Sequence, residues 1–235
     1  MQTELSGRRR PWDGIITLED LAIYERAGFG RKGGLGRRPG IVIIDVQYRT
    51  IGLEPKPILE AMELYYPTAC GEQGWRAVEH IAKLLQVARP KGVPVFYPHV
   101  APKAGYDAGR LGMKVPTIMG IDQKGYEFVA EVAPQPGDVL VPKKHPSAFF
   151  GTPMVSYLID KGVDTLLVCG CTTSGCVRST VSDAFAYNLH VAVIEECVYD
   201  RGQISHAVNL FDIQSKYADV ITLAEALDYL CSSPA

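Results

Sequence analysis

Three of the six cysteines in the chain stand close together, at 169, 171 and 176 in the segment CGCTTSGCVRST. A thiol can bind a metal, form a disulfide or act as a nucleophile. The cysteines lack the paired spacing of a zinc site, and the chain shows no secretory signal, so we expect it in the reducing cytoplasm, where disulfides are rare. The pattern favours attack of a thiolate on a substrate, with a redox or binding pair of Cys171 and Cys176 as the alternative.

The three cysteines have different expected surroundings. Cys169 lies inside an apolar run and is expected to be a buried, inert thiol. Cys171 stands at the following turn, where it either lines a site or fills space. Cys176 lies near the start of a predicted helix, where unpaired N–H groups and the helix dipole lower the pKa of a thiol. Cys176 is therefore the candidate nucleophile, and a packing role is its alternative.

Other polar residues also follow apolar runs. Asp45 follows the first such run, Lys143 and Lys144 follow the third, and Arg201 comes shortly after the fifth. Taken singly, the carboxylate can cap a turn, the lysine pair can be solvated, and Arg201 can pair with Asp200 or a helix end. In a parallel sheet, however, the carboxyl ends of the strands meet at one edge, where ligands bind. A thiol, a carboxylate and an ammonium at one edge form the set needed to attack a carbonyl carbon.

The elements that must position these residues alternate along the chain. The expected strands are short apolar runs at 41–44, 93–97, 139–141, 165–169, 191–194 and 219–222. Helical patterns are found at 75–88, 153–161, 174–188, 203–217 and 223–230. This alternation predicts an α/β fold, a three-layer α/β/α sandwich with a mostly parallel central sheet of about six strands.

Composition limits the domain organisation and the partners. Residues 1–39, rich in glycine and arginine, are expected to form an N-terminal arm, and residues 40–235 a single domain. The long connections at 52–74 and 98–121 are expected at the rim of a site or in subunit contacts. A net charge of −2 gives no attraction for nucleic acid, and no apolar run is long enough to span a membrane. The expected partner is a small molecule.

Four segments resemble one known family. They are IVIIDVQ, KKHPSAFFGT, GVDTLLVCGCTTSGCVRSTVSDA and VYDR, and the likeness runs from about Gly40 to Leu230. In order and spacing they resemble the isochorismatase-like cysteine hydrolases, specifically the branch of N-carbamoylsarcosine and maleamate amidohydrolases. The resemblance implies a catalytic triad of Asp45, Lys143 and Cys176. Lys143 is selected over Lys144 because the family lysine lies four residues before the serine of SAF.

The resemblance also implies how a substrate is held. It implies a cis peptide bond between Cys171 and Thr172, which would direct the backbone N–H groups of Thr172 and Cys176 into an oxyanion hole. It implies that Arg201 binds a substrate carboxylate, and it makes Thr173 a second substrate-binding residue. The family further implies a homo-oligomer, a tetramer, in which neighbouring copies cover the arm and the long loops.

The expected activity is hydrolysis of a small carboxylate-bearing amide or N-carbamoyl compound, through a cysteine-linked acyl or carbamoyl intermediate and with release of ammonia. N-carbamoylsarcosine is the first candidate, giving sarcosine, carbon dioxide and ammonia, and maleamate is the second. No cofactor is expected. The metal-binding nicotinamidases have a histidine two positions after the aspartate, where this chain has Gln47, so no metal is expected either. The roles of Lys144, His99 and His145 are left open.

Overall fold

The computed structural model describes residues 8–232, and its centre is a sheet of six parallel strands in the order β3-β2-β1-β4-β5-β6. The strands are β1 (Pro39–Ile44), β2 (Val95–Val100), β3 (Val139–Lys143), β4 (Thr165–Cys171), β5 (His190–Tyr199) and β6 (Asp219–Ile221). The chain builds outward from β1 to β3 on one side, then crosses to β4 and builds outward to β6 on the other. The carboxyl ends of β1 and β4 therefore form a topological switch point, the usual ligand site of such sheets.

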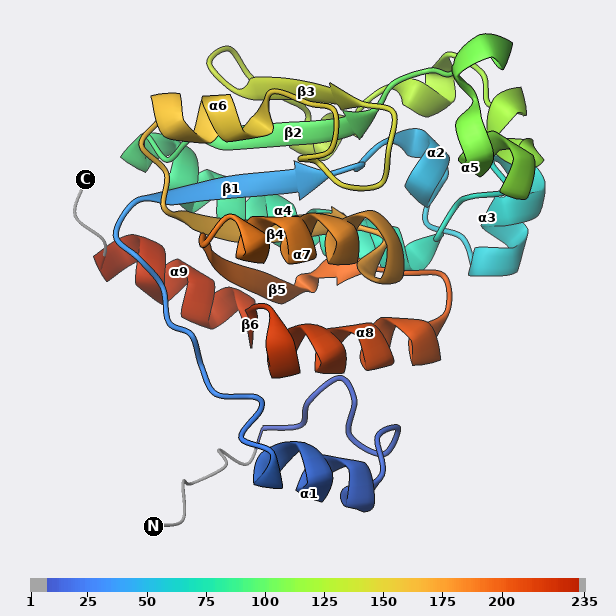
Figure 1. Cartoon of the computed structure of the whole chain (residues 1–235). Coiled ribbons are helices and arrows are strands. Elements are labelled where there is room, and N and C mark those ends of the chain that lie inside the picture. The colour runs from blue at the N-terminus through green and yellow to red at the C-terminus, as the bar shows by residue number, and fades with distance from the viewer. Residues whose placement is uncertain (1–7, 233–235) are drawn as a thin grey trace.

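Helices cover both faces of the sheet (Figure 1). One face packs against α4 (Glu72–Ala88) and α9 (Leu223–Ser232), and the other against α6 (Met154–Asp160), α7 (Arg178–Ala186) and α8 (Gln203–Lys216). Alternate residues of β1 enter the two cores, so that every residue from Ile41 to Ile44 is buried. Burial on both faces explains the continuous apolar runs in the sequence. The predicted three-layer parallel α/β sandwich is confirmed.

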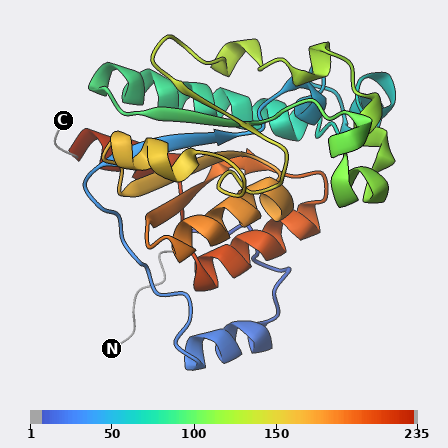
Figure 2. The ribbon, with the colours of Figure 1, turned by 45° about the horizontal axis from the view of Figure 1, so that its top comes forward.

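The two long connections lie beyond the carboxyl ends of the strands (Figures 1 and 2). The first follows the short helix α2 (Tyr48–Ile51) and contains α3 (Ile58–Leu64). The second contains α5 (Gly109–Lys114) and several 3-10 turns. Both were expected at the rim of a site, and both contribute residues to the cavity described below.

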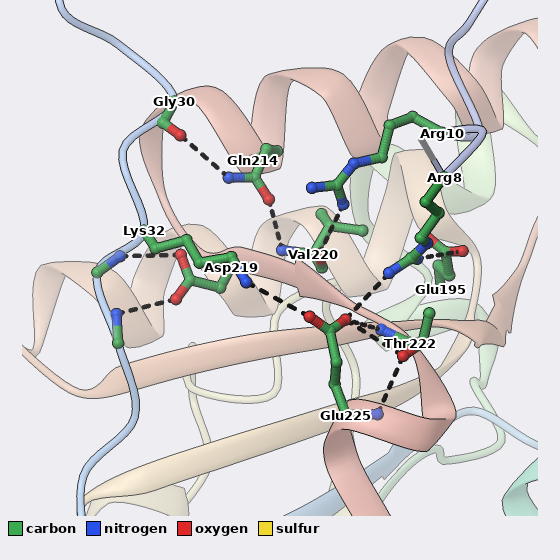
Figure 3. Close-up of polar contacts among 12 residues, drawn as sticks. Arg8, Arg10, Gly30, Lys32, Glu195, Gln214, Asp219, Val220, Thr222 and Glu225 are labelled. Atoms are coloured by element: carbon green, nitrogen blue, oxygen red, sulfur yellow. Dashed lines mark hydrogen bonds and ion pairs between the residues drawn. The ribbon is translucent and has the colours of Figure 1, made fainter. Parts of the chain in front are cut away.

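The segment before β1 packs on its own chain, next to α8 and β6 (Figure 1). It contains α1 (Leu18–Arg26), and the rings of Trp12 and Tyr24 contact Phe211 of α8 with centroids 6.0 and 4.9 Å away. The Asp219 carboxylate, labelled in Figure 3, accepts the N–H groups of Gly33 and Gly34, both at 2.9 Å. These contacts fix the arm to the edge strand of the sheet.

The exposed edge of β6 is occupied by two side chains (Figure 3). Arg10 donates to the carbonyl oxygen of Val220 at 3.3 Å, and the N–H of Val220 donates to Gln214 at 2.8 Å. An unpaired strand edge invites pairing with another chain, so this cover blocks extension of the sheet.

Within residues 8–232 no helix is long and apolar enough to cross a membrane.

Candidate active site

Asp45 stands at the carboxyl end of β1 in an uncommon backbone conformation. Its φ of 53° lies in the left-handed region, which residues other than glycine rarely occupy. Its N–H donates to the Pro98 carbonyl at 2.8 Å, and its own carbonyl accepts the Thr50 hydroxyl at 2.8 Å. Gly170 of β4 permits a close approach here, because a Cβ at that position would collide with the backbone of Ile44. The turn holds the Asp45 side chain at the switch point.

Lys143 reaches the same point from the end of β3. Its ammonium lies 2.7 Å from Oδ2 of Asp45, and the two side chains are 1% and 2% exposed. A second hydrogen bond joins the ammonium to the carbonyl oxygen of His145 at 3.3 Å. Burial lowers the pKa of the Lys143 ammonium, but the interactions with Asp45 and Cys176 outweigh this effect and raise the pKa. Lys143 is therefore a buried cation paired with the Asp45 carboxylate.

Cys176 lies in a π-helical turn, Thr173–Val177, that precedes α7. Its half-buried thiol faces the cavity that Asp45 and Lys143 also line. Burial raises the pKa of the Cys176 thiol, the Asp45 carboxylate raises it further, and Lys143 lowers it. The expectation that the helix start lowers this pKa is wrong, because burial and Asp45 outweigh that effect. The thiol is protonated at neutral pH and requires a base.

One carboxylate oxygen of Asp45 is free to act as the base for the Cys176 thiol. Its Oδ1 is buried and has no hydrogen-bond partner in the described part of the chain, whereas Oδ2 is held by Lys143. The geometry therefore provides a carboxylate with one oxygen anchored and one oxygen available for a proton, close enough to affect the pKa of Cys176.

The other cysteines of the segment have the surroundings of inert thiols. Cys171 is 1% exposed, and its Sγ donates to the carbonyl oxygen of Asp45 at 3.5 Å. Burial raises the pKa of Cys171 to about 12, so its thiol is hard to ionise. Cys169 is fully buried in β4. All six cysteines are free thiols, and the peptide bond from Cys171 to Thr172 is cis.

The site is a cavity of about 200 Å³, a size that suits a small molecule. The sequence-predicted residues that line it are Asp45, Lys143, Lys144, His145, Cys171, Thr172, Cys176 and Arg201. No group of three or more possible metal ligands occurs in residues 8–232. The cavity thus brings together the three residues expected to perform catalysis and the arginine expected to bind substrate.

Arg201 lines the cavity, and within residues 8–232 its guanidinium has no acidic side chain as a partner. Its Nε donates to the carbonyl oxygen of Thr68 at 2.9 Å, and Nη2 bonds the same oxygen. The Asp200 carboxylate instead accepts the backbone N–H of Arg201 at 2.8 Å and both the N–H and the hydroxyl of Ser174, at 2.8 and 2.6 Å. In the described chain the guanidinium forms no ion pair, so the alternative of a pair with Asp200 does not hold.

Thr173 and two histidines have other surroundings. Thr173 is fully buried and does not line the cavity, and its hydroxyl lies 2.8 Å from Nδ1 of His206 on α8. His99 also lies outside the cavity lining, with Nδ1 3.0 Å from the Tyr97 carbonyl oxygen. His145 lines the cavity and packs its ring on Phe150. The Thr173 side chain therefore does not face the cavity, although Thr173 was expected to bind the substrate.

Two cavity residues have roles that the sequence left open or missed. Lys144 forms an ion pair with Asp107 at 2.6 Å and so ties the second long connection to the site. Arg49 of α2, which the sequence reasoning did not select, is 6% exposed and lines the cavity. Its position four residues after Asp45 is the sequence signal that points to it.

Comparison with known proteins identifies the family of this chain. Residues 39–225 match the model of the isochorismatase domain. The chain belongs to the isochorismatase family. Within it, a maleamate amidohydrolase from Pseudomonas putida is 36% identical over 208 residues, covering 86% of this chain and 91% of that protein. An N-carbamoylsarcosine amidase from an Arthrobacter species is 31% identical over 220 residues, covering 91% and 79%.

Solved structures agree on the fold. A cysteine hydrolase from Pseudomonas syringae pv. phaseolicola superposes with a TM-score of 0.75 at 23% identity, covering 88% of this chain and 98% of that one. An N-carbamoylsarcosine amidase from Thermoplasma acidophilum superposes with a TM-score of 0.61 at 22% identity, covering 79% and 96%. The expected isochorismatase-like family is confirmed by the domain match, and the two relatives are named as an amidohydrolase and an amidase.

Proposed function

We propose that the protein hydrolyses a small carboxylate-bearing amide or N-carbamoyl compound and releases ammonia, with Cys176 as the nucleophile. The observation that carries this proposal is the buried pair of Asp45 and Lys143 beside the Cys176 thiol in one small cavity. The amidohydrolase names of the two relatives support the reaction class.

The first step forms the covalent intermediate. Oδ1 of Asp45 accepts the thiol proton while Sγ of Cys176 attacks the carbonyl carbon, and Lys143 keeps the carboxylate ionised and stabilises the thiolate. The backbone N–H groups of Thr172 and Cys176 stabilise the oxyanion. The carbon–nitrogen bond then breaks, and Asp45 returns the proton to the departing ammonia.

The second step frees the enzyme. Asp45 takes a proton from water, the resulting hydroxide attacks the acyl carbon, and the carbon–sulfur bond breaks as the Cys176 sulfur regains a proton. The sum is amide plus water to acid plus ammonia. With an N-carbamoyl substrate the acid formed is a carbamic acid, which loses carbon dioxide.

Two substrates are the candidates. The sequence placed N-carbamoylsarcosine first, whereas the Pseudomonas putida relative, which has the higher identity and is matched over a larger share of its own length, favours maleamate. Measurement of both ammonia and carbon dioxide from each compound tests the proposal, because N-carbamoylsarcosine should yield both products and maleamate only ammonia. Cys176→Ala, prepared in parallel, excludes a contaminating hydrolase. Failure of the wild type on both compounds and on other small carboxylate-bearing amides would contradict the proposed function.

We further propose that the protein is a cytoplasmic homo-oligomer, a tetramer. Exposed apolar side chains on the two rim connections support association, including Leu59 and Leu64 of α3 and Met113 of α5. Light scattering at micromolar concentration tests the assembly, and a fully active monomer would contradict it.

A further inference from the structure

Arg49 carries a buried positive charge that no described residue neutralises. Its side chain is 6% exposed, and its Nε has no hydrogen-bond acceptor in residues 8–232. No carboxylate of the described chain lies within ion-pairing distance of its guanidinium, which stacks on the Tyr126 ring at 5.0 Å from the centroid. Burial of a charge without a counter-ion is costly, and an aromatic face offsets only part of that cost. An anionic ligand at this position would neutralise this charge.

The same cavity wall holds Arg201. Thr68 connects the two arginines: its hydroxyl donates to the backbone carbonyl of Arg49 at 2.6 Å, and its carbonyl accepts Nε of Arg201 at 2.9 Å. Both arginines line the cavity together with Cys176. Two arginines that lack acidic partners thus share one wall of the site that contains the nucleophile.

The other cations that line the cavity bond to acceptors in the protein. Lys143 is paired with Asp45, and Lys144 is paired with Asp107. Lys103, at the rim, donates to the carbonyl oxygen of Asp107 at 3.2 Å. Of the cavity's cations in residues 8–232, Arg49, Arg201 and Lys103 therefore lack an acidic partner, and Arg49 is the buried one.

We infer that Arg49 and Arg201 jointly bind the carboxylate of the substrate, so that Arg49 is a second specificity-determining residue for acidic amides. This inference rests on the proposed function. It narrows the substrates to linear amides small enough for the carboxylate and the carbonyl carbon that Cys176 attacks to fit in the same cavity. Guanidiniums bind carboxylates through parallel hydrogen bonds that an ammonium does not reproduce. Neutral amides would leave the buried Arg49 cation unpaired and are therefore disfavoured.

Binding to the inactive Cys176→Ser protein tests this without turnover. Isothermal titration compares N-carbamoylsarcosine with 1,1-dimethylurea, which lacks only the carboxylate, and maleamate with its neutral diamide. We expect Arg49→Met to weaken binding of the acids by at least about thirtyfold, as for loss of one partner of a buried charge pair, and to change binding of the neutral compounds less than about twofold. Arg49→Lys should weaken the acids by about tenfold.

A control variant and a double variant distinguish direct contact of the arginines with the carboxylate from a long-range effect of positive charge in the cavity. Lys103→Met removes a cation of the rim that already has a protein acceptor, and it should leave affinity for the acids within about threefold. Because both arginines bind one carboxylate, the double variant Arg49→Met/Arg201→Met should lose less affinity than the product of the single losses. Equal losses in Lys103→Met and Arg49→Met would overturn the inference, as would equal losses for acidic and neutral ligands.

Stability without ligand gives an independent result. Since Arg49 is an uncompensated buried cation, the ligand-free Arg49→Met protein should unfold at the same temperature as the wild type or higher. Lower stability together with unchanged affinity for acids would show a structural role and overturn the inference. If the wild type turns over the amides but affinity is insensitive to Arg49, only the inference fails. If no amide is turned over but binding of acids depends on Arg49, only the proposed function fails.

Discussion

The ammonium of Lys143 lies 2.7 Å from the carboxylate of Asp45, and both side chains are almost completely buried. The two residues come from the ends of β3 and β1, which are separated in the sheet by β2. Removal of one partner of a buried pair leaves a charge without compensation, whereas removal of both does not. The pair therefore affects both folding stability and catalysis, and a comparison of single and double variants separates the two effects.

We expect Lys143→Met to lower the free energy of unfolding by about 3–5 kcal/mol, because Asp45 is left buried and unpaired. The double variant Asp45→Asn/Lys143→Met should recover most of this stability and remain inactive. Urea denaturation together with an ammonia assay measures both properties. Recovery of activity along with stability would show that the pair is only structural.

The pair also sets the ionisation of Cys176. Because the Asp45 carboxylate raises the pKa of the thiol and Lys143 lowers it, Asp45→Asn should shift the pH profile of Cys176 alkylation to lower pH, and Lys143→Met should shift it to higher pH. Iodoacetamide labelling followed by peptide mass spectrometry measures the profile. A Cys231→Ser background removes the exposed thiol of α9. Shifts in the opposite directions would contradict the arrangement described for the site.

His206 gives the folded state a dependence on pH. Burial lowers its pKa below the ordinary value of 6.5, and the smaller effect of Asp200 opposes this. The unfolded chain therefore binds a proton before the folded protein does, so stability is complete above about pH 6.5 and falls as the pH drops through the folded-state pKa. His206→Asn should reduce the loss of unfolding free energy between about pH 7 and pH 5. His190→Asn, at the exposed start of β5, is the control, and equal losses in all three proteins would refute this role.

Arg201 should distinguish acidic from neutral substrates. We expect Arg201→Lys to lower kcat/KM for carboxylate-bearing amides by about 2–4 kcal/mol in free energy, because the ammonium lacks the planar fork of the guanidinium. Neutral amides of similar size should be poor substrates of the wild type and lose little more in the variant. Steady-state kinetics on both classes tests this, and equal losses would indicate that Arg201 only supports the fold through Thr68.

Much of the fold follows from local patterns in the sequence. Runs such as that at 41–44 are apolar at every position because helices cover both faces of the sheet, and this type of burial can be read without a structure. The carboxyl-edge rule likewise placed Asp45, Lys143 and Cys176 together. The sequence could not identify the strand order, because strands of similar composition are interchangeable by pattern alone.

Features that depend on packing around a side chain were harder to predict. The helix start suggested a low pKa for Cys176, but burial and the neighbouring carboxylate raise it. Thr173 is next to the predicted oxyanion hole in sequence, yet its hydroxyl bonds His206 of α8. Arg49 was missed because an arginine on a short helix is usually solvated, whereas here its guanidinium lies over the Tyr126 ring and the residue is buried at the cavity.

Mass spectrometry of the enzyme quenched during turnover tests the central claim most directly. With N-carbamoylsarcosine or maleamate, the peptide that contains Cys176 should carry the acyl group of the substrate, and Cys176→Ala should show no adduct and release no ammonia. Cys171→Ala serves as the matched control and should still form the adduct on Cys176. An adduct on Cys171, or full ammonia release by Cys176→Ala, would contradict the assignment of Cys176 as the nucleophile.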